Sequence, residues 1–201
     1  MRLNRWWVYQ RERFPVFKHG LLIAAVCFGV LVFSLPGGET PGPSILARFA
    51  AAFATVLLFF LQLRIADEFK DYEEDRRCRP HRPVPRGLVS LGELKAVAGA
   101  AAVVQAALAL GVSPRLLLPL AAVWAYMLLM TREFFAPAWL KRHAVIYLLS
   151  HSLILPLIYL YVSAGGWFAL GQPPPGGLGF LLAFGFFSGV VVEIGRKVWA
   201  P

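Results

Sequence analysis

The chain has 201 residues, of which 58% are hydrophobic, and it carries a formal net charge of +9. So large an apolar share excludes an ordinary soluble domain and predicts an integral membrane protein. Because the positive charge is gathered in a few segments between apolar runs, it favours loops at one membrane face, and we expect no nucleic acid among the partners.

The first 18 residues interleave basic and aromatic side chains. This composition is typical of a segment that lies along the membrane surface with its rings among the lipid headgroups. A cleaved signal peptide is the alternative, which is disfavoured because no small-residue cleavage site follows the first apolar run. We therefore expect residues 1–18 to form a basic aromatic membrane-surface segment, followed by a single transmembrane domain over 19–201.

Six apolar runs occupy much of the remaining chain. Each is long enough to cross a bilayer once a flanking helical turn is added. Proline, glycine and serine near 36–38, 113–114 and 171–177 predict loops. The expected fold class is all-α, a polytopic transmembrane helical bundle of about six spans, at 19–35, 45–66, 96–112, 116–130, 144–162 and 178–192.

Lysine and arginine are unevenly distributed among the segments that flank these runs. Eighteen of the twenty lie in the N-terminal segment, in the loops near 64–95 and 131–143, or in the C-terminal tail. Cytoplasmic loops carry such an excess of positive charge. We expect both termini and the loop 67–90 to face the cytoplasm, in a cell inner or plasma membrane.

One stretch differs from this pattern, because six of the eleven acidic residues fall between positions 67 and 75. Among them, Asp67, Asp71 and Asp75 are spaced four residues apart, which places them on one face of a helix. Stacked carboxylates repel one another, so a cation is expected there, and Mg²⁺ is commonly held by one or two carboxylates together with substrate phosphates. The alternative is a solvated, self-paired helix end, which does not explain the spacing of the aspartates.

A basic segment with three prolines follows directly. The prolines between positions 80 and 85 end the helix and predict an extended loop. Arg79, Arg82 and Arg86 offer forked donors suited to phosphate oxygens. Carboxylates, a metal ion and arginines together predict a diphosphate site.

The run D-E-F-K-D-Y-E-E-D, followed by R-R-C-R-P-H and R-P-V-P-R-G-L-V-S, resembles the UbiA-type family of intramembrane prenyltransferases. The first acidic motif of that family reads N-x-x-x-D-x-x-x-D and is followed by R-P-hydrophobic-P-x-G. The gap between the two parts is similar to that of the archaeal-lipid branch, and Asp67 stands at the position of the family's asparagine. The two-part motif is specific, since it requires both halves at one spacing and at a membrane boundary.

The resemblance implies the N-terminal two-thirds of the family fold and a Mg²⁺-dependent reaction within membrane lipid. In that reaction an isoprenoid group moves from a prenyl diphosphate to a lipophilic or aromatic acceptor. The carboxylates of the first acidic motif would act in catalysis and as metal ligands, and the loop arginines would bind the diphosphate. These residues are Asp67, Asp71 and Asp75, with Arg79, Arg82 and Arg86.

The resemblance also concerns three residues further along the chain. Family members place a tyrosine and, four residues later, a lysine near the end of the fourth span. Here Tyr126 precedes Met130 at that spacing, so Arg132 and Lys141 of the following loop are candidates for diphosphate binding, although positive charge on a cytoplasmic loop explains them equally well. Glu193 stands where the family's second acidic motif begins and is implied as a further metal ligand.

No further acid follows Glu193, whereas the family usually continues with more spans. This favours one alternative, a non-catalytic truncated family member that binds prenyl diphosphate or lipid. We expect the exposed faces of the first and sixth spans to need a partner, either a second copy of the chain or a separate C-terminal half. A transporter subunit is disfavoured because the spans contain almost no charge.

Three polar side chains inside the spans also need a role. Gln62 and Arg64 close the second run just before the aspartates, and they either line the site or, for Arg64, reach back to the interface. His151 lies in the fifth run, where a lone histidine is most often hydrogen-bonded to a neighbouring helix. We interpret His151 as structural in the first instance, with contact to substrate as the alternative.

Overall fold

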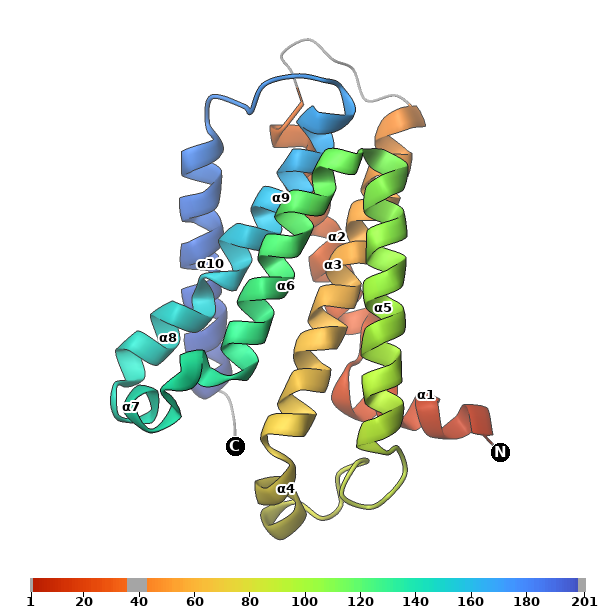
Figure 1. Cartoon of the computed structure of the whole chain (residues 1–201), viewed down its shortest axis with the longest axis vertical. Coiled ribbons are helices and arrows are strands. Elements are labelled where there is room, and N and C mark those ends of the chain that lie inside the picture. Colours follow the sequence, from red (N-terminus) through yellow and green to blue (C-terminus); the bar gives the residue numbers. More distant parts are fainter. Residues whose placement is uncertain (1, 36–42, 199–201) are drawn as a thin grey trace. The chain divides into compact units, whose positions relative to one another are not determined.

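A computed structural model describes residues 2–35 and 43–198 of the chain. The predicted loop at 36–38 lies outside the described residues. All regular structure within them is helical (Figure 1). The helices are α1 (Arg2–Arg13), α2 (Val16–Phe33), α3 (Pro43–Lys70), α4 (Tyr72–Cys78), α5 (Leu91–Val112), the 3₁₀ turn η1 (Pro114–Leu116), α6 (Leu117–Thr131), the 3₁₀ turn η2 (Glu133–Phe135), α7 (Pro137–Arg142), α8 (Ala144–Ser152), α9 (Ile154–Ala169) and α10 (Leu178–Val198).

Among the described residues, six helical stretches are long and apolar enough to cross a membrane. They confirm the prediction of an all-α, polytopic membrane protein with six spans. Most begin or end beyond the apolar runs, because helix geometry continues into polar flanks where hydropathy has already fallen. The stretches are Val16–Phe33, Ser44–Lys70, Leu91–Val112, Pro114–Thr131, Ala144–Ala169 and Leu178–Gly195.

The chain divides into two compact units. The first comprises residues 1–26 and 53–108, and the second comprises residues 27–52 and 109–201. Helices α2, α3 and α5 each contribute one part to each unit.

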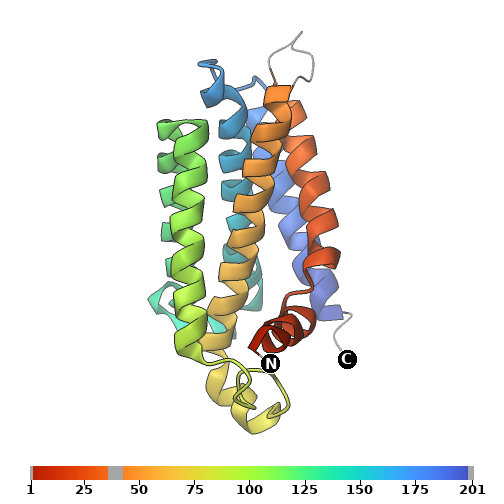
Figure 2. The same cartoon turned by 90° about the vertical axis from the view of Figure 1, so that its right-hand side faces the viewer.

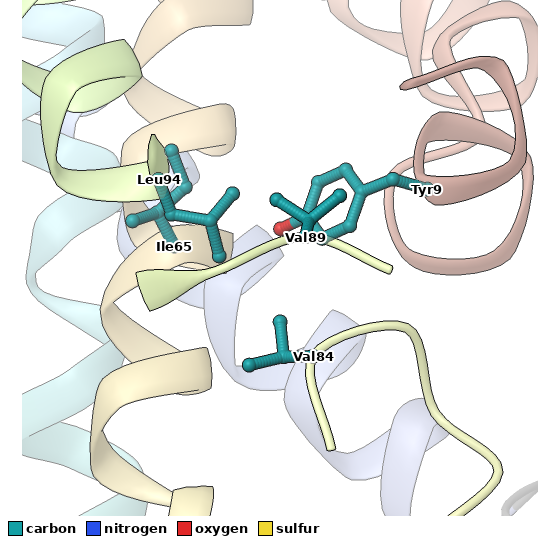
Figure 3. Packing of buried hydrophobic residues seen from close by; sticks show 5 residues of the cluster. All are labelled: Tyr9, Ile65, Val84, Val89 and Leu94. Carbon is teal, nitrogen blue, oxygen red and sulfur yellow. The ribbon is translucent and has the colours of Figure 1, made fainter. Parts of the chain in front are cut away.

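The first unit contains α1, α4 and the loop between α4 and α5. Pro15 separates α1 from α2, because the residue before a proline is disfavoured in helical geometry. Figure 2 shows α1 at the same end of α3 and α5 as α4. Tyr9 of α1 packs there into a buried cluster with side chains of α3, α5 and the loop (Figure 3). The other members of this cluster are Ile65, Val84, Val89 and Leu94.

The loop of residues 79–90 is compact because its backbone is hydrogen-bonded internally. The N–H of Leu88 donates to the Pro83 carbonyl at 2.9 Å, and Gly87 takes a positive φ of 77° that suits glycine. Ser90 then begins α5 with a capping box, in which the Glu93 N–H donates to Ser90 Oγ and the Ser90 N–H donates to the Glu93 carboxylate. The predicted extended loop is therefore a folded turn that leads directly into the next span.

In the second unit, α9 packs against α6 and α10, and α10 also packs against α8. Small residues on α10 permit this approach, since a Cβ on Gly189 would lie 3.1 Å from the Ser152 carbonyl oxygen. The fifth span is divided at Leu153 into α8 and α9. Pro156 explains the division, because it has no N–H to donate to the carbonyl four residues earlier.

Candidate active site

The acidic motif follows the end of α3 and is divided by a bend. α3 ends at Lys70, Asp71 has φ −95° and ψ 4°, and α4 begins at Tyr72. The backbone N–H of Asp71 nevertheless donates to the Asp67 carbonyl at 2.9 Å, and that of Asp75 donates to the Asp71 carbonyl at 2.8 Å. The expectation of one uninterrupted helix is thus corrected at Asp71, while the one-turn spacing of the aspartates is retained.

The bend has an electrostatic explanation. The first turn of α4 contains Glu73, Glu74 and Asp75. Negative side chains are favoured at the N-terminus of a helix and disfavoured at its C-terminus. A new helix that starts at Tyr72 therefore places these acids at a favourable end, where a longer α3 would have placed them at an unfavourable one.

Asp75 is the most enclosed residue of the motif, with 1% of its surface exposed. Arg82 Nη1 donates to both of its carboxylate oxygens, at 2.6 and 2.5 Å, and Arg79 Nη1 donates at 3.2 Å. Arg13 of α1 lies 3.8 Å away. Burial alone would raise the pKa of Asp75, but the hydrogen bonds from Arg82 and Arg79 and the charges of Arg82 and Arg13 outweigh it, so the pKa is lowered. Asp75 is therefore ionised and held by arginines.

A second buried acid, Glu68, lies next to this group with 2% exposure. Arg13 Nε donates to it at 2.5 Å, and Arg64 Nε lies 3.6 Å from the same oxygen. Arg64 also lies 3.6 Å from Asp67, whose side chain is 43% exposed. Successive acids at the end of α3 thus point to different surroundings, Glu68 inward and Asp67 toward solvent.

The remaining predicted arginine of the loop contacts α1. Arg86 Nη2 donates to Glu12 at 3.0 Å, and Arg86 Nη1 donates to the His81 carbonyl at 3.0 Å. The structure thus gathers the predicted arginines around the acidic motif and α1, and their side chains stay partly in solvent. Side-chain exposures of 45% for Arg79, 23% for Arg82 and 37% for Arg86 leave each guanidinium within reach of a dissolved anion.

Arg13 and Glu68 are the residues of this cluster that sequence reasoning missed. Glu68 follows Arg64 by four residues in a helix, which is a local signal for pairing. Arg13 is 55 positions away from Glu68, and nothing in its neighbourhood distinguishes it from the other basic residues of α1.

The donor set suits Mg²⁺ only in combination with a substrate. Within residues 2–35 and 43–198, no three histidine, cysteine or acidic side chains come together as a metal site. Asp67 and Asp71 are one helical turn apart and neither is fully buried. Two carboxylates, with substrate phosphates and waters as the other ligands, form the arrangement in which Mg²⁺ is commonly bound.

The other predicted site residues belong to the second unit. Arg132 and Lys141 are exposed, and Glu193 is partly buried. The Arg132 guanidinium lies 6.0 Å from the centre of the Phe135 ring. Their predicted roles toward the diphosphate and the metal stay predictions.

The polar residues within the spans are engaged with protein groups. Gln62 donates to the Ala98 carbonyl at 3.1 Å and so joins α3 to α5. His151 Nδ1 lies 2.9 Å from the Tyr147 carbonyl and 3.3 Å from the Ser150 hydroxyl. His151 Nε2 lies 3.6 Å from the carboxylate of Glu133, which is 6% exposed. These contacts support a structural interpretation of His151.

Two comparisons with known proteins bear on this geometry. The sequence profile of the UbiA prenyltransferase family matches residues 21–195, which include the whole acidic motif, the arginine loop and Glu193. The comparison with curated proteins gave no match.

Proposed function

Because the chain belongs to the UbiA prenyltransferase family, we propose that it moves an isoprenoid group from a prenyl diphosphate to a lipophilic or aromatic acceptor. Family membership supports a prenyltransferase type of function and a setting within membrane lipid. The observation that carries the location of the site is the arginine-bound Asp75 beside Asp67 and Asp71, directly after an apolar span.

In this proposal the arginines exchange one anion for another. Arg79 and Arg82 are hydrogen-bonded to Asp75. A diphosphate carries more negative charge than a carboxylate and offers more acceptor oxygens for forked donors. Substrate would therefore draw these guanidinium groups partly away from Asp75, and Arg86 would add a donor from the same loop.

Mg²⁺ fits the site with Asp67 and Asp71 as its protein ligands, and the release of Asp75 from the arginines would add a third carboxylate. When bound, the metal ion would supply positive charge that offsets the negative charge developing on the departing diphosphate. Glu193, Arg132 and Lys141 are proposed as further groups toward the metal and the diphosphate. The apolar spans would hold the isoprenoid tail and keep water from the allylic cation.

We place the site and both termini on the cytoplasmic face, because the lysines and arginines are concentrated there. Cys78 is exposed at the end of α4, whereas Cys27 is buried. A membrane-impermeant maleimide should therefore label Cys78 from the cytoplasmic side of oriented membranes. Labelling from the opposite side alone would overturn this orientation.

The function is tested with the purified chain in nanodiscs, titrated with geranylgeranyl diphosphate and shorter homologues with and without Mg²⁺. We expect Mg²⁺-dependent binding that Asp71→Asn weakens by at least tenfold, which corresponds to about 1.4 kcal/mol. Glu73→Gln removes the same charge from an exposed position two residues later and should bind like wild type.

Release of diphosphate in the presence of an acceptor mixture then separates an enzyme from a binding protein. Binding without turnover would identify a protein that binds prenyl diphosphate without transferring the prenyl group. Equal binding by wild type and Asp71→Asn would show that the carboxylates are structural.

A further inference from the structure

Ion pairs join helix α1 to residues in and on both sides of the arginine loop, which is the loop of residues 79–90. Arg5 Nη2 donates to Glu93 at 2.6 Å, Glu12 accepts from Arg86, and Arg13 pairs with Glu68. Along the chain, these partners extend from the last turn of α3 to the first turn of α5. The basic aromatic segment expected to lie on the membrane surface therefore has a second set of contacts, with the protein itself.

The three ion pairs are expected to contribute unequally to stability, because their side chains are buried to different extents. The side chains of Arg5 and Glu93 are 32% and 36% exposed, and those of Arg86 and Glu12 are 37% and 34% exposed. Pairs with this exposure contribute little, since water and salt screen them. The side chains of Arg13 and Glu68 are 9% and 1% exposed, so this pair is the one whose loss would leave a buried charge poorly compensated.

Arg13 also joins the two halves of the acidic motif. Its Nε donates to Glu68 in α3, and its Nη2 lies 3.8 Å from Asp75 in α4. The bend at Asp71 lies between these two helices. One guanidinium thus contacts the motif on both sides of the bend, through a hydrogen bond to Glu68 and a charge contact with Asp75, and the two contacts together favour one angle between the helices.

The position of Arg13 does not depend on the ion pairs alone. Tyr9, one turn earlier in α1, is 3% exposed and packs among Ile65, Val89 and Leu94 (Figure 3). This apolar contact would hold α1 in place even when the Arg13 charge is removed. A substitution at Arg13 therefore separates the effect of the ion pairs from the docking of the helix.

We propose that Arg13 is a positioning residue that holds α4 and its Asp75 in a fixed arrangement relative to the end of α3, so that the diphosphate site is preorganised before substrate binds. The inference rests on the proposed function of that site. It assigns to α1 a role in the site besides membrane attachment.

The test compares Arg13→Gln with two matched variants in the full chain in nanodiscs. Arg11→Gln removes the same charge from an exposed position of the same helix and controls for membrane attraction. Arg13→Lys keeps the charge and loses the forked geometry. Circular dichroism confirms that each variant retains its helices.

Local order of α4 is measured without substrate, by limited trypsin cleavage after Arg76 and Arg77. Both residues are exposed, and the bonds after Arg79 and Arg82 precede prolines that trypsin cleaves poorly. Cleavage inside a helix requires local opening, so its rate reports the population of the opened state. We expect Arg13→Gln to raise this rate roughly tenfold, Arg13→Lys to raise it less, and Arg11→Gln to leave it unchanged.

The same variants are then titrated with geranylgeranyl diphosphate in Mg²⁺. We expect Arg13→Gln to raise Kd, with partial rescue in Arg13→Lys, because only the ordered arrangement of α4 is competent to bind. The rise in Kd should be smaller than the rise in cleavage rate, since Kd follows the ordered fraction of α4 and cleavage follows the opened fraction. Cleavage and binding at wild-type values in Arg13→Gln would overturn the inference. A wild-type protein that binds no diphosphate would overturn the proposed function instead, and the cleavage rates would then decide separately whether Arg13 orders α4.

Discussion

The two buried acids Asp75 and Glu133 face different kinds of basic side chain. Asp75, in the first unit, faces Arg82, Arg79 and Arg13, which stay charged at any physiological pH. Glu133, in the second unit, faces His151 at 3.6 Å, a residue that can be neutral. Burial of an acid therefore does not by itself identify an anion site, and the arginines around Asp75 are the stronger indication.

The backbone conformation around Asp75 also differs from that around Glu133. Asp75 lies in a regular helix and is fixed mainly by side chains from other segments. Glu133, Phe134 and Phe135 all have positive φ values, of 48°, 51° and 60°, in η2. Each non-glycine residue in this conformation costs roughly 1–2 kcal/mol. Glu133 is thus held by a strained turn, whereas Asp75 is held by contacts that a stronger anion can replace.

Asp75→Asn tests this comparison most directly, and we expect it to have the largest effect on trypsin cleavage and diphosphate binding. The asparagine keeps the size of the side chain but removes the negative charge that the arginines share. Because the side chains of Arg82 and Arg79 are 23% and 45% exposed, water compensates them in part, so the cost stays below the about 3–5 kcal/mol of a fully buried pair. Trypsin should therefore cleave the variant much faster after Arg76 and Arg77, and Mg²⁺-dependent diphosphate binding should be lost.

Glu74→Gln is the matched control for this variant. Glu74 lies 3.9 Å from Arg79, but its side chain is 67% exposed. Such an exposed pair contributes little, because water and salt screen it, so cleavage and binding should stay close to wild type. An Asp75→Asn protein as resistant to trypsin as wild type would mean that the arginines do not depend on Asp75 for their position.

A second prediction concerns Glu133→Gln, whose effect should be smaller and of a different kind. Glutamine removes the negative charge that faces His151 at 3.6 Å, and we expect a loss of about 1–3 kcal/mol in the free energy of unfolding. Diphosphate binding should be unchanged, because we propose that Glu133 stabilises the turn and does not bind the substrate. Thermal unfolding and diphosphate titration in nanodiscs measure the two quantities separately.

His151→Gln and the double variant complete a mutant cycle for this pair. A coupling energy near zero would show that the pair does not stabilise the turn. Loss of diphosphate binding in Glu133→Gln with unchanged thermal stability would make the second acid part of the site and remove the contrast with Asp75.

The same contrast explains how much of the molecule is predictable from its sequence. The six spans and the acidic motif follow from local composition and spacing, which is why both can be located without a structure. The bend at Asp71 and the pairing of Glu68 with Arg64 are also local, and they follow from the preference of acids for a helix N-terminus and from four-residue spacing. The family of the chain, predicted from the two-part motif, is confirmed by the profile match.

Two features have no local signal. Arg13 reaches Glu68 only because α1 folds back onto the end of α3, and four other arginines or lysines within residues 1–18 are indistinguishable from it in sequence. Likewise, the left-handed turn at Glu133–Phe135 contains no glycine or asparagine to predict it. Both depend on contacts between distant segments, which spacing arguments do not reach.

The smallest expected effect tests whether the turn that holds Glu133 is strained. Phe135 has a φ of 60° and is 71% exposed, so replacing its ring removes little packing apart from the nearby Arg132. Phe135→Ala and Phe135→Gly lose that ring equally, but alanine keeps the Cβ that clashes in a left-handed conformation. Relief of about 1–2 kcal/mol of strain outweighs the roughly 0.4–1 kcal/mol that glycine costs through the unfolded chain. The glycine variant should therefore be more stable than the alanine variant by about 0.5–1 kcal/mol in thermal or denaturant unfolding, the reverse of the order found in ordinary helices. If the alanine variant is equally stable or more stable, the backbone at Phe135 is not held left-handed. The contrast between Glu133 in a strained turn and Asp75 with replaceable contacts would then lose its support.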